Sequence, residues 1–192
     1  MEPAIATFGS LTINGAGAPS LLLNANGFQP FSISTGILTV KNFSLDLSGT
    51  PPAPATTGIL NIDSSVNYVV SSSQQLGPTQ GTGPIALGAN MLTLDTGTAT
   101  GLEYEGIISG TGASLTKMGT GGSQTLKGTN TYTGDTMIKE GTLGIVSNDN
   151  LGTSGTLMLG TGLADTPTLQ SQSTLTLSRP VELNATSSMI ET

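Results

Sequence analysis

The feature of this sequence that most limits its fold is a short template, one glycine followed by apolar residues at alternate positions. The template occurs at residues 9–13, 36–40, 58–62, 141–145 and 155–159, and residues 91–94 and 174–177 fit it without the glycine. Apolar residues two apart predict β-strands, because successive side chains of a strand point to opposite faces. The unit recurs in one direction, mostly at intervals of about thirteen to thirty residues, which predicts parallel strands stacked in the coils of a solenoid.

Helices are not expected anywhere in the chain. There are 27 glycines and 10 prolines among 192 residues, and no apolar pattern with a spacing of three to four residues is sustained between them. Alternating βα units are therefore excluded, which leaves a sandwich, a barrel or a parallel solenoid. Antiparallel folds would favour tight hairpin turns between mirror-paired strands. We therefore predict an all-β chain that forms a parallel β-solenoid.

The alternation also predicts which side chains face the interior. Val66, Tyr68 and Val70 alternate with polar or exposed neighbours and indicate a strand. The pairs Thr136/Ile138 and Leu143/Ile145 do the same later in the chain. The leucines expected to stack inside the solenoid are Leu11, Leu38, Leu60, Leu92, Leu143, Leu157 and Leu175.

We expect one domain over residues 1–192, with its less regular coils in residues 1–100. Two proline-containing segments, residues 49–57 and 74–84, predict loops that leave the coil, because proline cannot donate to a strand ladder. Recognition is expected to collect on such loops. Further coils are expected over residues 153–192. The pattern stops there partway into another coil, so we expect the chain to be a fragment of a longer solenoid. No signal peptide is expected at the start, Met1-Glu2-Pro3-Ala4.

Residues 115–146 hold the densest pattern, LTKMGTGGSQTLKGTNTYTGDTMIKEGTLGIV. This segment resembles the passenger-associated repeat of bacterial autotransporter proteins, also called the autotransporter-associated β-strand repeat. The matching positions are Gly119, Gly121, Thr125, Leu126, Gly128, Asn130, Thr131, Tyr132, Gly134, Thr136, Ile138, Gly141, Thr142, Leu143 and Ile145. The resemblance extends over residues 101–152 and implies a right-handed parallel β-helix.

Charge and composition exclude several classes of function. The net charge is −7, and the five cations are scattered singly, at Lys41, Lys117, Lys127, Lys139 and Arg179. Nucleic acid and anionic membrane surfaces are disfavoured as partners, because both need clustered cations. The absence of histidine and cysteine removes the commonest general base, the commonest metal ligand and thiolate chemistry. No apolar run is long enough to span a bilayer.

Few residues could support chemistry. Glu103 and Glu105 would share one face of a strand, where they could pair for acid–base work or bind a hard cation, but we favour a solvated edge or turn. Asn148-Asp149-Asn150 lacks the ligand spacing of a calcium loop and predicts a capped turn. Residues 110–112 and 119–122 fail the phosphate-loop patterns and predict glycine turns, and residues 152–155 fail the nucleophile-elbow spacing.

Two features of the repeat have structural and functional interpretations. Tyr132 could be a binding aromatic, but we expect its ring to cover a turn and its hydroxyl to bond a backbone group. Thr129, Thr131 and Thr133 alternate and could form a flat hydroxyl ladder of the ice-binding kind. The simpler interpretation is that threonine suits an exposed strand face.

The resemblance implies a passenger segment that acts as a β-helical stalk on the bacterial surface, outside the outer membrane, and supports adhesion or display and passenger secretion and folding. Its implied partners are a C-terminal outer-membrane β-barrel translocator in the parent chain and a receptor or glycan on a host or neighbouring cell, with self-association also possible. No catalytic, cofactor-binding or metal-ligating residue is predicted. The alternatives are a self-assembling extracellular fibre subunit and a β-helical polysaccharide-degrading enzyme, which would need a groove of clustered charged residues.

Overall fold

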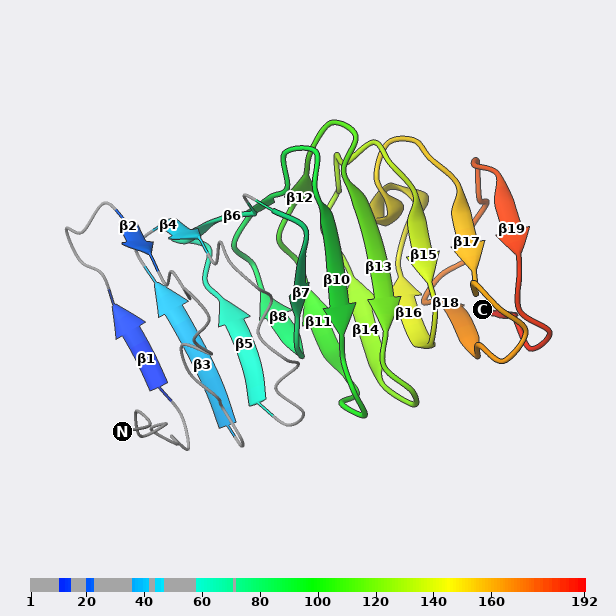
Figure 1. Ribbon diagram of the computed structural model, residues 1–192, viewed down its shortest axis with the longest axis horizontal. Coiled ribbons are helices and arrows are strands. Elements are labelled where there is room, and N and C mark those ends of the chain that lie inside the picture. Colours follow the sequence, from blue (N-terminus) through cyan, green and yellow to red (C-terminus); the bar gives the residue numbers. More distant parts are fainter. Residues whose placement is uncertain (1–10, 15–19, 23–35, 42–43, 47–57, 71) are drawn as a thin grey trace.

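A computed structural model describes residues 11–14, 20–22, 36–41, 44–46, 58–70 and 72–192, with side chains described from residue 59 on. These residues form a parallel β-helix, in which every strand pairing is parallel (Figure 1). The predicted all-β parallel solenoid is therefore confirmed. In this part of the chain no helix has the length and the apolar character needed to cross a membrane.

The strands that the structure describes form three sheets that run along the solenoid. The nine-stranded sheet contains, in order, β1 (Leu11–Asn14), β3 (Gly36–Lys41), β5 (Gly58–Ile62), β8 (Thr79–Gly81), β11 (Leu102–Tyr104), β14 (Ser123–Leu126), β16 (Gly141–Ile145), β18 (Pro167–Ser171) and β20 (Met189–Glu191). The six-stranded sheet contains β7 (Gln74–Leu76), β10 (Met91–Asp95), β13 (Ser114–Met118), β15 (Thr136–Ile138), β17 (Leu157–Leu159) and β19 (Val181–Leu183). The five-stranded sheet contains β2 (Ser20–Leu22), β4 (Ser44–Asp46), β6 (Asn67–Val69), β9 (Ile85–Ala86) and β12 (Ile108–Ser109).

Coils stack in register, so that equivalent residues lie above one another. In the six-stranded sheet Leu115 pairs with Thr136, and Thr136 pairs with Leu157, at a spacing of 21 residues in each step. In the nine-stranded sheet Leu143 pairs with Leu169. The glycine template serves both sheets, because residues 141–145 form β16 whereas residues 155–159 lead into β17. A common template therefore marks a strand that follows a corner, and it does not specify which sheet the strand joins.

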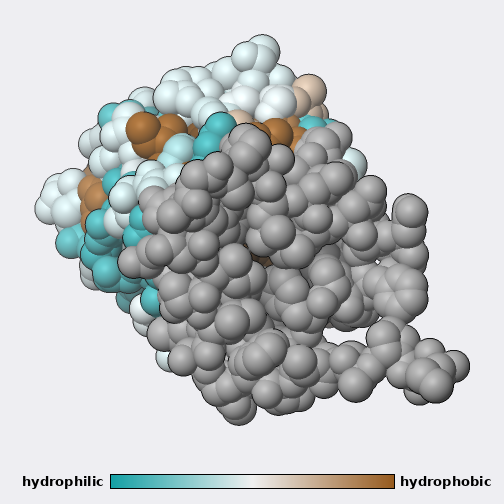
Figure 2. All heavy atoms as spheres, turned by 90° about the vertical axis from the view of Figure 1, so that its left-hand side faces the viewer, coloured by the Kyte–Doolittle hydropathy of each residue, from teal (hydrophilic) through white to brown (hydrophobic). Residues whose placement is uncertain are grey.

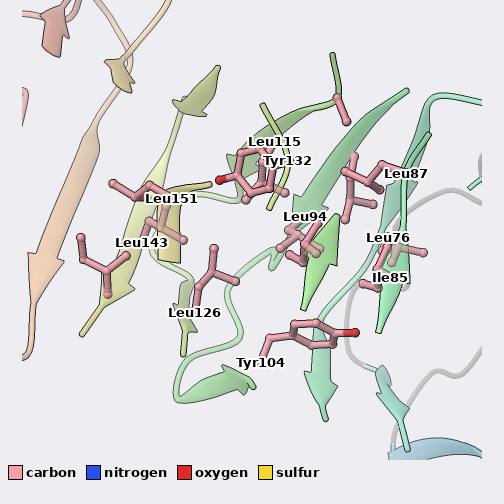
Figure 3. Close-up of a cluster of buried hydrophobic side chains, with 14 of the residues drawn as sticks. Leu76, Ile85, Leu87, Leu94, Tyr104, Leu115, Leu126, Tyr132, Leu143 and Leu151 are labelled. Atoms are coloured by element: carbon pink, nitrogen blue, oxygen red, sulfur yellow. The ribbon is translucent and has the colours of Figure 1, made fainter. Parts of the chain in front are cut away.

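The interior is built from the alternate residues that the pattern selects. Leu92, Leu143 and Leu157 are fully buried, as predicted. Leu60 and Leu175 are only partly buried against the core. Leu11 and Leu38 pair in register, but their side chains lie outside the described residues. Figure 3 shows buried side chains from successive coils in one continuous cluster, in which each buried leucine contributes on the order of 2 kcal/mol.

The predicted loop at residues 74–84 is wrong. Strands β7 and β8 occupy this segment, and Gln74, Leu76 and Thr79 are buried. The two prolines are accommodated because they lie just before strands, where their carbonyls still accept hydrogen bonds, Pro78 from Leu60 and Pro84 from Tyr68. The other predicted loop, residues 49–57, lies outside the described residues.

Two smaller expectations also fail. Residues 174–177 fit the template but form no strand, and they belong to the long connection between β18 and β19. One short 3₁₀ helix, η1 (Asn148–Leu151), is present although no helix was expected. It coincides with the predicted capped turn, and the Asn150 side chain accepts hydrogen bonds from the Val146 and Ser147 backbone amides, both at 2.8 Å.

The third side of the solenoid changes along the chain. The five-stranded sheet ends at β12, whereas the other two sheets continue to β19 and β20 (Figure 1). From this level on, the third side is formed by residues 128–133 and then by η1. This change falls inside the segment that resembles the passenger-associated repeat.

Candidate functional site

Residues 115–146, the segment that resembles the passenger-associated repeat and is called the repeat below, span the consecutive strands β13 to β16, and their apolar positions face inward. Leu126 on β14, Ile138 on β15 and Leu143 on β16 are fully buried. The intervening Thr125 and Met137 are half-buried on the outer face. The alternation therefore selects residues that stack on the coil below, where Gln124 pairs with Leu102 and Thr136 pairs with Leu115.

A column of glycines lets successive coils approach closely at one corner. A Cβ added at Gly128 would clash with the carbonyl of Gly106, and a Cβ at Gly106 would clash with the carbonyl of Gly83. Any larger residue would force two coils apart, so these glycines are required by contact between backbones. Gly128 is one of the positions that match the repeat.

Two buried asparagines close the third side of the repeat by side-chain hydrogen bonds. The Asn130 side chain accepts a hydrogen bond from the Ile108 amide at 2.8 Å and donates one to the Asn150 carbonyl at 2.5 Å. The Asn150 side chain in turn donates to the Gly128 carbonyl at 2.9 Å. Both side chains are 1% exposed. They satisfy backbone groups that a further strand would otherwise have to satisfy.

The Tyr132 ring is part of this corner and lies inside the cluster (Figure 3). It is completely buried, so it cannot be a binding aromatic, and burial raises the pKa of its hydroxyl. The hydroxyl bonds the Thr136 hydroxyl at 2.6 Å, and Thr136 donates to the Leu151 carbonyl at 3.2 Å. The expected bond to a backbone group is therefore made through Thr136 and not directly.

A buried lysine lies at the corner between the six-stranded and nine-stranded sheets. Lys117 is 0% exposed, and its Nζ donates to the carbonyls of Met118 at 2.8 Å, Glu140 at 3.3 Å and Gly122 at 3.4 Å. The three carbonyls match the three donors of an ammonium group. Burial lowers the pKa of Lys117 to about 8, and the charges of Asp95 and Glu140 oppose this shift.

Arg179 ties the connection between β18 and β19 to the η1 corner. Its guanidinium donates to the Leu151 and Gly152 carbonyls, both at 2.7 Å, and to the carbonyls of Asn148 and Ser154, both at 3.2 Å. The planar guanidinium suits several carbonyls at once. Together with the Ser173 hydroxyl, which donates to the Val146 carbonyl, this side chain holds a segment that has no strand of its own.

The two acidic residues singled out in the sequence do share one outer face. Glu103 and Glu105 are exposed, and the Lys127 ammonium lies 2.6 Å from Glu103 and 3.9 Å from Glu105. Lys127 follows the neighbouring strand β14 in the next coil. The group is an exposed ion pair on an outer face, where such pairs contribute little to stability.

The other sequence features have structural roles. Gly112 and Gly121 have φ values of 78° and 77°, as expected for glycine turns. Thr129, Thr131 and Thr133 do not lie on a strand, so they form no ladder on a strand face. The Thr133 hydroxyl accepts a hydrogen bond from the Gly112 amide at 2.7 Å. Within the described residues, no group of three or more acidic, histidine or cysteine side chains could hold a metal ion.

Sequence reasoning missed the roles of Asn130, Asn150, Lys117 and Arg179. Lys117 could have been found, because it lies two residues after Leu115 and so shares its inward face. The asparagines gave a weaker signal, since asparagine is also a common turn residue. Nothing in the local sequence of Arg179 indicates contacts with residues about thirty positions earlier.

The surface seen from the amino-terminal end is mostly pale or hydrophilic over the described residues, with small separate hydrophobic areas (Figure 2). Comparison with family models, with curated proteins and with solved structures finds no match to this chain.

Proposed function

We propose that this chain is a segment of a bacterial autotransporter passenger domain, in which the β-helix is a stalk on the cell surface that supports adhesion or display. The proposal rests on one observation, that the residues matching the repeat serve coil stacking. Leu126, Ile138 and Leu143 are core residues, Gly128 permits contact between coils, and Asn130 closes the corner. A rigid parallel β-helix is consistent with a structural role.

In this proposal the repeat assists secretion by folding as it leaves the outer membrane. A C-terminal β-barrel translocator in the parent chain would carry the extended passenger outward. Each coil contacts chiefly its two neighbours, so a coil can add to a folded one at a small loop-closure cost. The partner bound by the complete passenger would be a receptor or glycan on another cell.

The experiment is surface display of a fusion between this chain and a translocator barrel. Leu143→Asp and Leu157→Asp each place a charge among fully buried side chains. Both changes should lower display and make the emerging chain sensitive to external protease. The matched control changes are Thr142→Asp, beside Leu143 on β16, and Lys139→Gln, and neither should alter display.

The opposite pattern would overturn the stacking account. If Thr142→Asp and Lys139→Gln abolish display while the leucine changes leave it intact, the segment acts by binding an export factor. If all four variants are displayed normally, folding of these coils does not assist secretion.

A further inference from the structure

Four of the six methionines in this chain lie on the outer face of the six-stranded sheet. They are Met91 on β10, Met118 on β13, Met137 on β15 and Met158 on β17. The inward residues next to each methionine are buried. Met91 itself is 43% exposed, and the other three methionines are half-buried. The sulfur atoms therefore belong to the surface and not to the core.

The parallel register aligns two of these side chains, those of Met137 and Met158. Met137 pairs directly with Met158, so their Cα atoms are about 4.8 Å apart on adjacent strands. Thr116 pairs with Met137 on the other side. The Met91 sulfur lies 3.7 Å from the Thr116 hydroxyl, so it leans toward the row that contains the methionine pair. The row across the sheet is Thr93, Thr116, Met137 and Met158, whereas Met91 pairs with Ser114 in the row beside it.

The charges of this outer face favour a cation. The described outward residues of the six strands include two carboxylates, Asp95 and Glu182, and no lysine or arginine. Lys117 faces inward on β13 and is bound by carbonyls. Lys139 follows β15, and its charge adds to the hydrogen bonds from Thr161 that lower the pKa of Asp165 in the loop after β17. The row of thioethers itself has no positive side chain.

We propose that Met137 and Met158 bind a soft monovalent d¹⁰ cation, Cu(I). Thioether sulfur is a soft and polarisable donor that selects Cu(I) over the hard divalent cations, which prefer oxygen. The unbranched methionine side chain has three rotatable bonds, so the sulfurs of neighbouring strands can converge on one ion. The strands fix the spacing of the side chains, which are far apart in sequence.

Ag(I), added as its nitrate in buffer free of chloride and thiols, is the probe, because it has the same charge and softness and is stable in air. We expect isothermal titration to show one Ag(I) per chain. In the NMR spectrum of methionine methyl groups, Ag(I) should shift the signals of Met137 and Met158 and leave that of Met189 in place. Met189 is 49% exposed on β20, in the nine-stranded sheet, and is the matched control.

The double variant Met137→Leu/Met158→Leu keeps side-chain volume, so it should keep the melting temperature of the parent chain. Its affinity for Ag(I) should fall by at least about tenfold, the lower end of losses seen when supporting groups of metal sites are removed. Met189→Leu should bind as the parent does. An unchanged affinity in the double variant, an equal loss in Met189→Leu, or methyl shifts spread over all methionines would overturn the proposal.

Discussion

Two successive coils of this molecule close their third side in different ways. The coil of β10, β11 and β12 uses a strand, in which Ile108 pairs in register with Ile85 and the Ile107 and Ser109 carbonyls accept the Ile85 and Leu87 amides. In the next coil, formed by β13, β14 and residues 128–133, the Thr131 and Thr133 amides still donate to the Ile108 and Gly110 carbonyls, but the Ile108 amide is accepted by the Asn130 side chain. One amide side chain can therefore take over a single bond of a ladder where the backbone leaves the strand conformation.

The same two coils differ in the polarity of their interiors. Leu94 on β10 pairs with Lys117 on β13, so an aliphatic position in one coil becomes a lysine in the next. In the lower coil the Tyr104 hydroxyl donates to the Gly83 carbonyl, whereas in the upper coil Tyr132 bonds a side chain. The upper coil thus depends more on buried side-chain hydrogen bonds, each of which is costly to break because the freed group stays away from water.

The largest effect is expected from Asn130→Asp, which keeps an acceptor for the Ile108 amide and removes the donor to the Asn150 carbonyl. At neutral pH a buried carboxylate would face a carbonyl oxygen, and the loss of unfolding free energy should be about 4 kcal/mol. Burial should raise the pKa of this new carboxyl above its unfolded value. The protonated form can donate, so the deficit relative to the parent should shrink as pH falls toward the unfolded pKa.

Urea unfolding of parent and variant at matched pH values measures this deficit. The exposed Thr129→Asp is the control, and it should show a small deficit that does not depend on pH. A deficit for Asn130→Asp that stays constant with pH would mean that the donor to Asn150 is unimportant.

A loss of comparable size, but without the dependence on pH, is expected for Asn130→Ala. This change leaves the Ile108 amide and the Asn150 carbonyl without their partner, at about 1 to 3 kcal/mol for each buried group. Thr129→Ala, beside it and exposed, should cost less than about 0.5 kcal/mol. Both values come from chemical denaturation. Equal stability of the two variants would show that the third side of the repeat does not need the asparagine.

The buried lysine should make the upper coil respond to alkaline pH. Because burial lowers the pKa of Lys117 from 10.5 to about 8, the unfolded chain binds more protons than the folded chain between these values. The unfolding free energy should therefore rise between pH 8 and pH 10, by on the order of 2 kcal/mol from this group. Lys117→Met should abolish this rise, as measured by urea unfolding across the range. A rise of the same size in Lys117→Met would contradict the assignment.

The smallest effect is expected from Tyr132→Phe. The Thr136 hydroxyl would lose one partner but keep its bond to the Leu151 carbonyl. The ring would still fill its buried site, so the cost should be about 1 kcal/mol, the value of one hydrogen bond. Tyr132→Ala should cost about 3 to 5 kcal/mol because it also leaves a cavity. If Tyr132→Phe is as damaging as Tyr132→Ala, the hydroxyl network is more important than the packing.

Periodicity predicted the parts of this fold that depend on alternation alone. It placed Thr136 and Ile138 on one inward face and predicted parallel stacking, because a period of two and a repeated direction are local properties of the sequence. It failed at residues 74–84, where proline suggested a loop although Pro78 and Pro84 lie just before strands. Whether a proline lies in a loop or just before a strand depends on how the coils stack, and the local sequence does not define this.

The corner of the repeat was less predictable for a related reason. Asn130 and Asn150 are twenty residues apart, and their hydrogen bonds exist only when the coils are stacked with the observed spacing. The same holds for Arg179, which reaches back to the η1 corner. A buried polar network is defined by long-range contacts, so residue type and local spacing alone could not identify it.

The most direct test of the central claim is native-state hydrogen exchange of single amides measured by NMR. If Asn130 continues the ladder of the third side, the Ile108 amide should exchange as slowly as the Ile85 amide, which donates to the Ile107 carbonyl. Exchange of the Ile108 amide at the rate of an exposed loop, while Ile85 remains protected, would show that the side chain does not replace the strand.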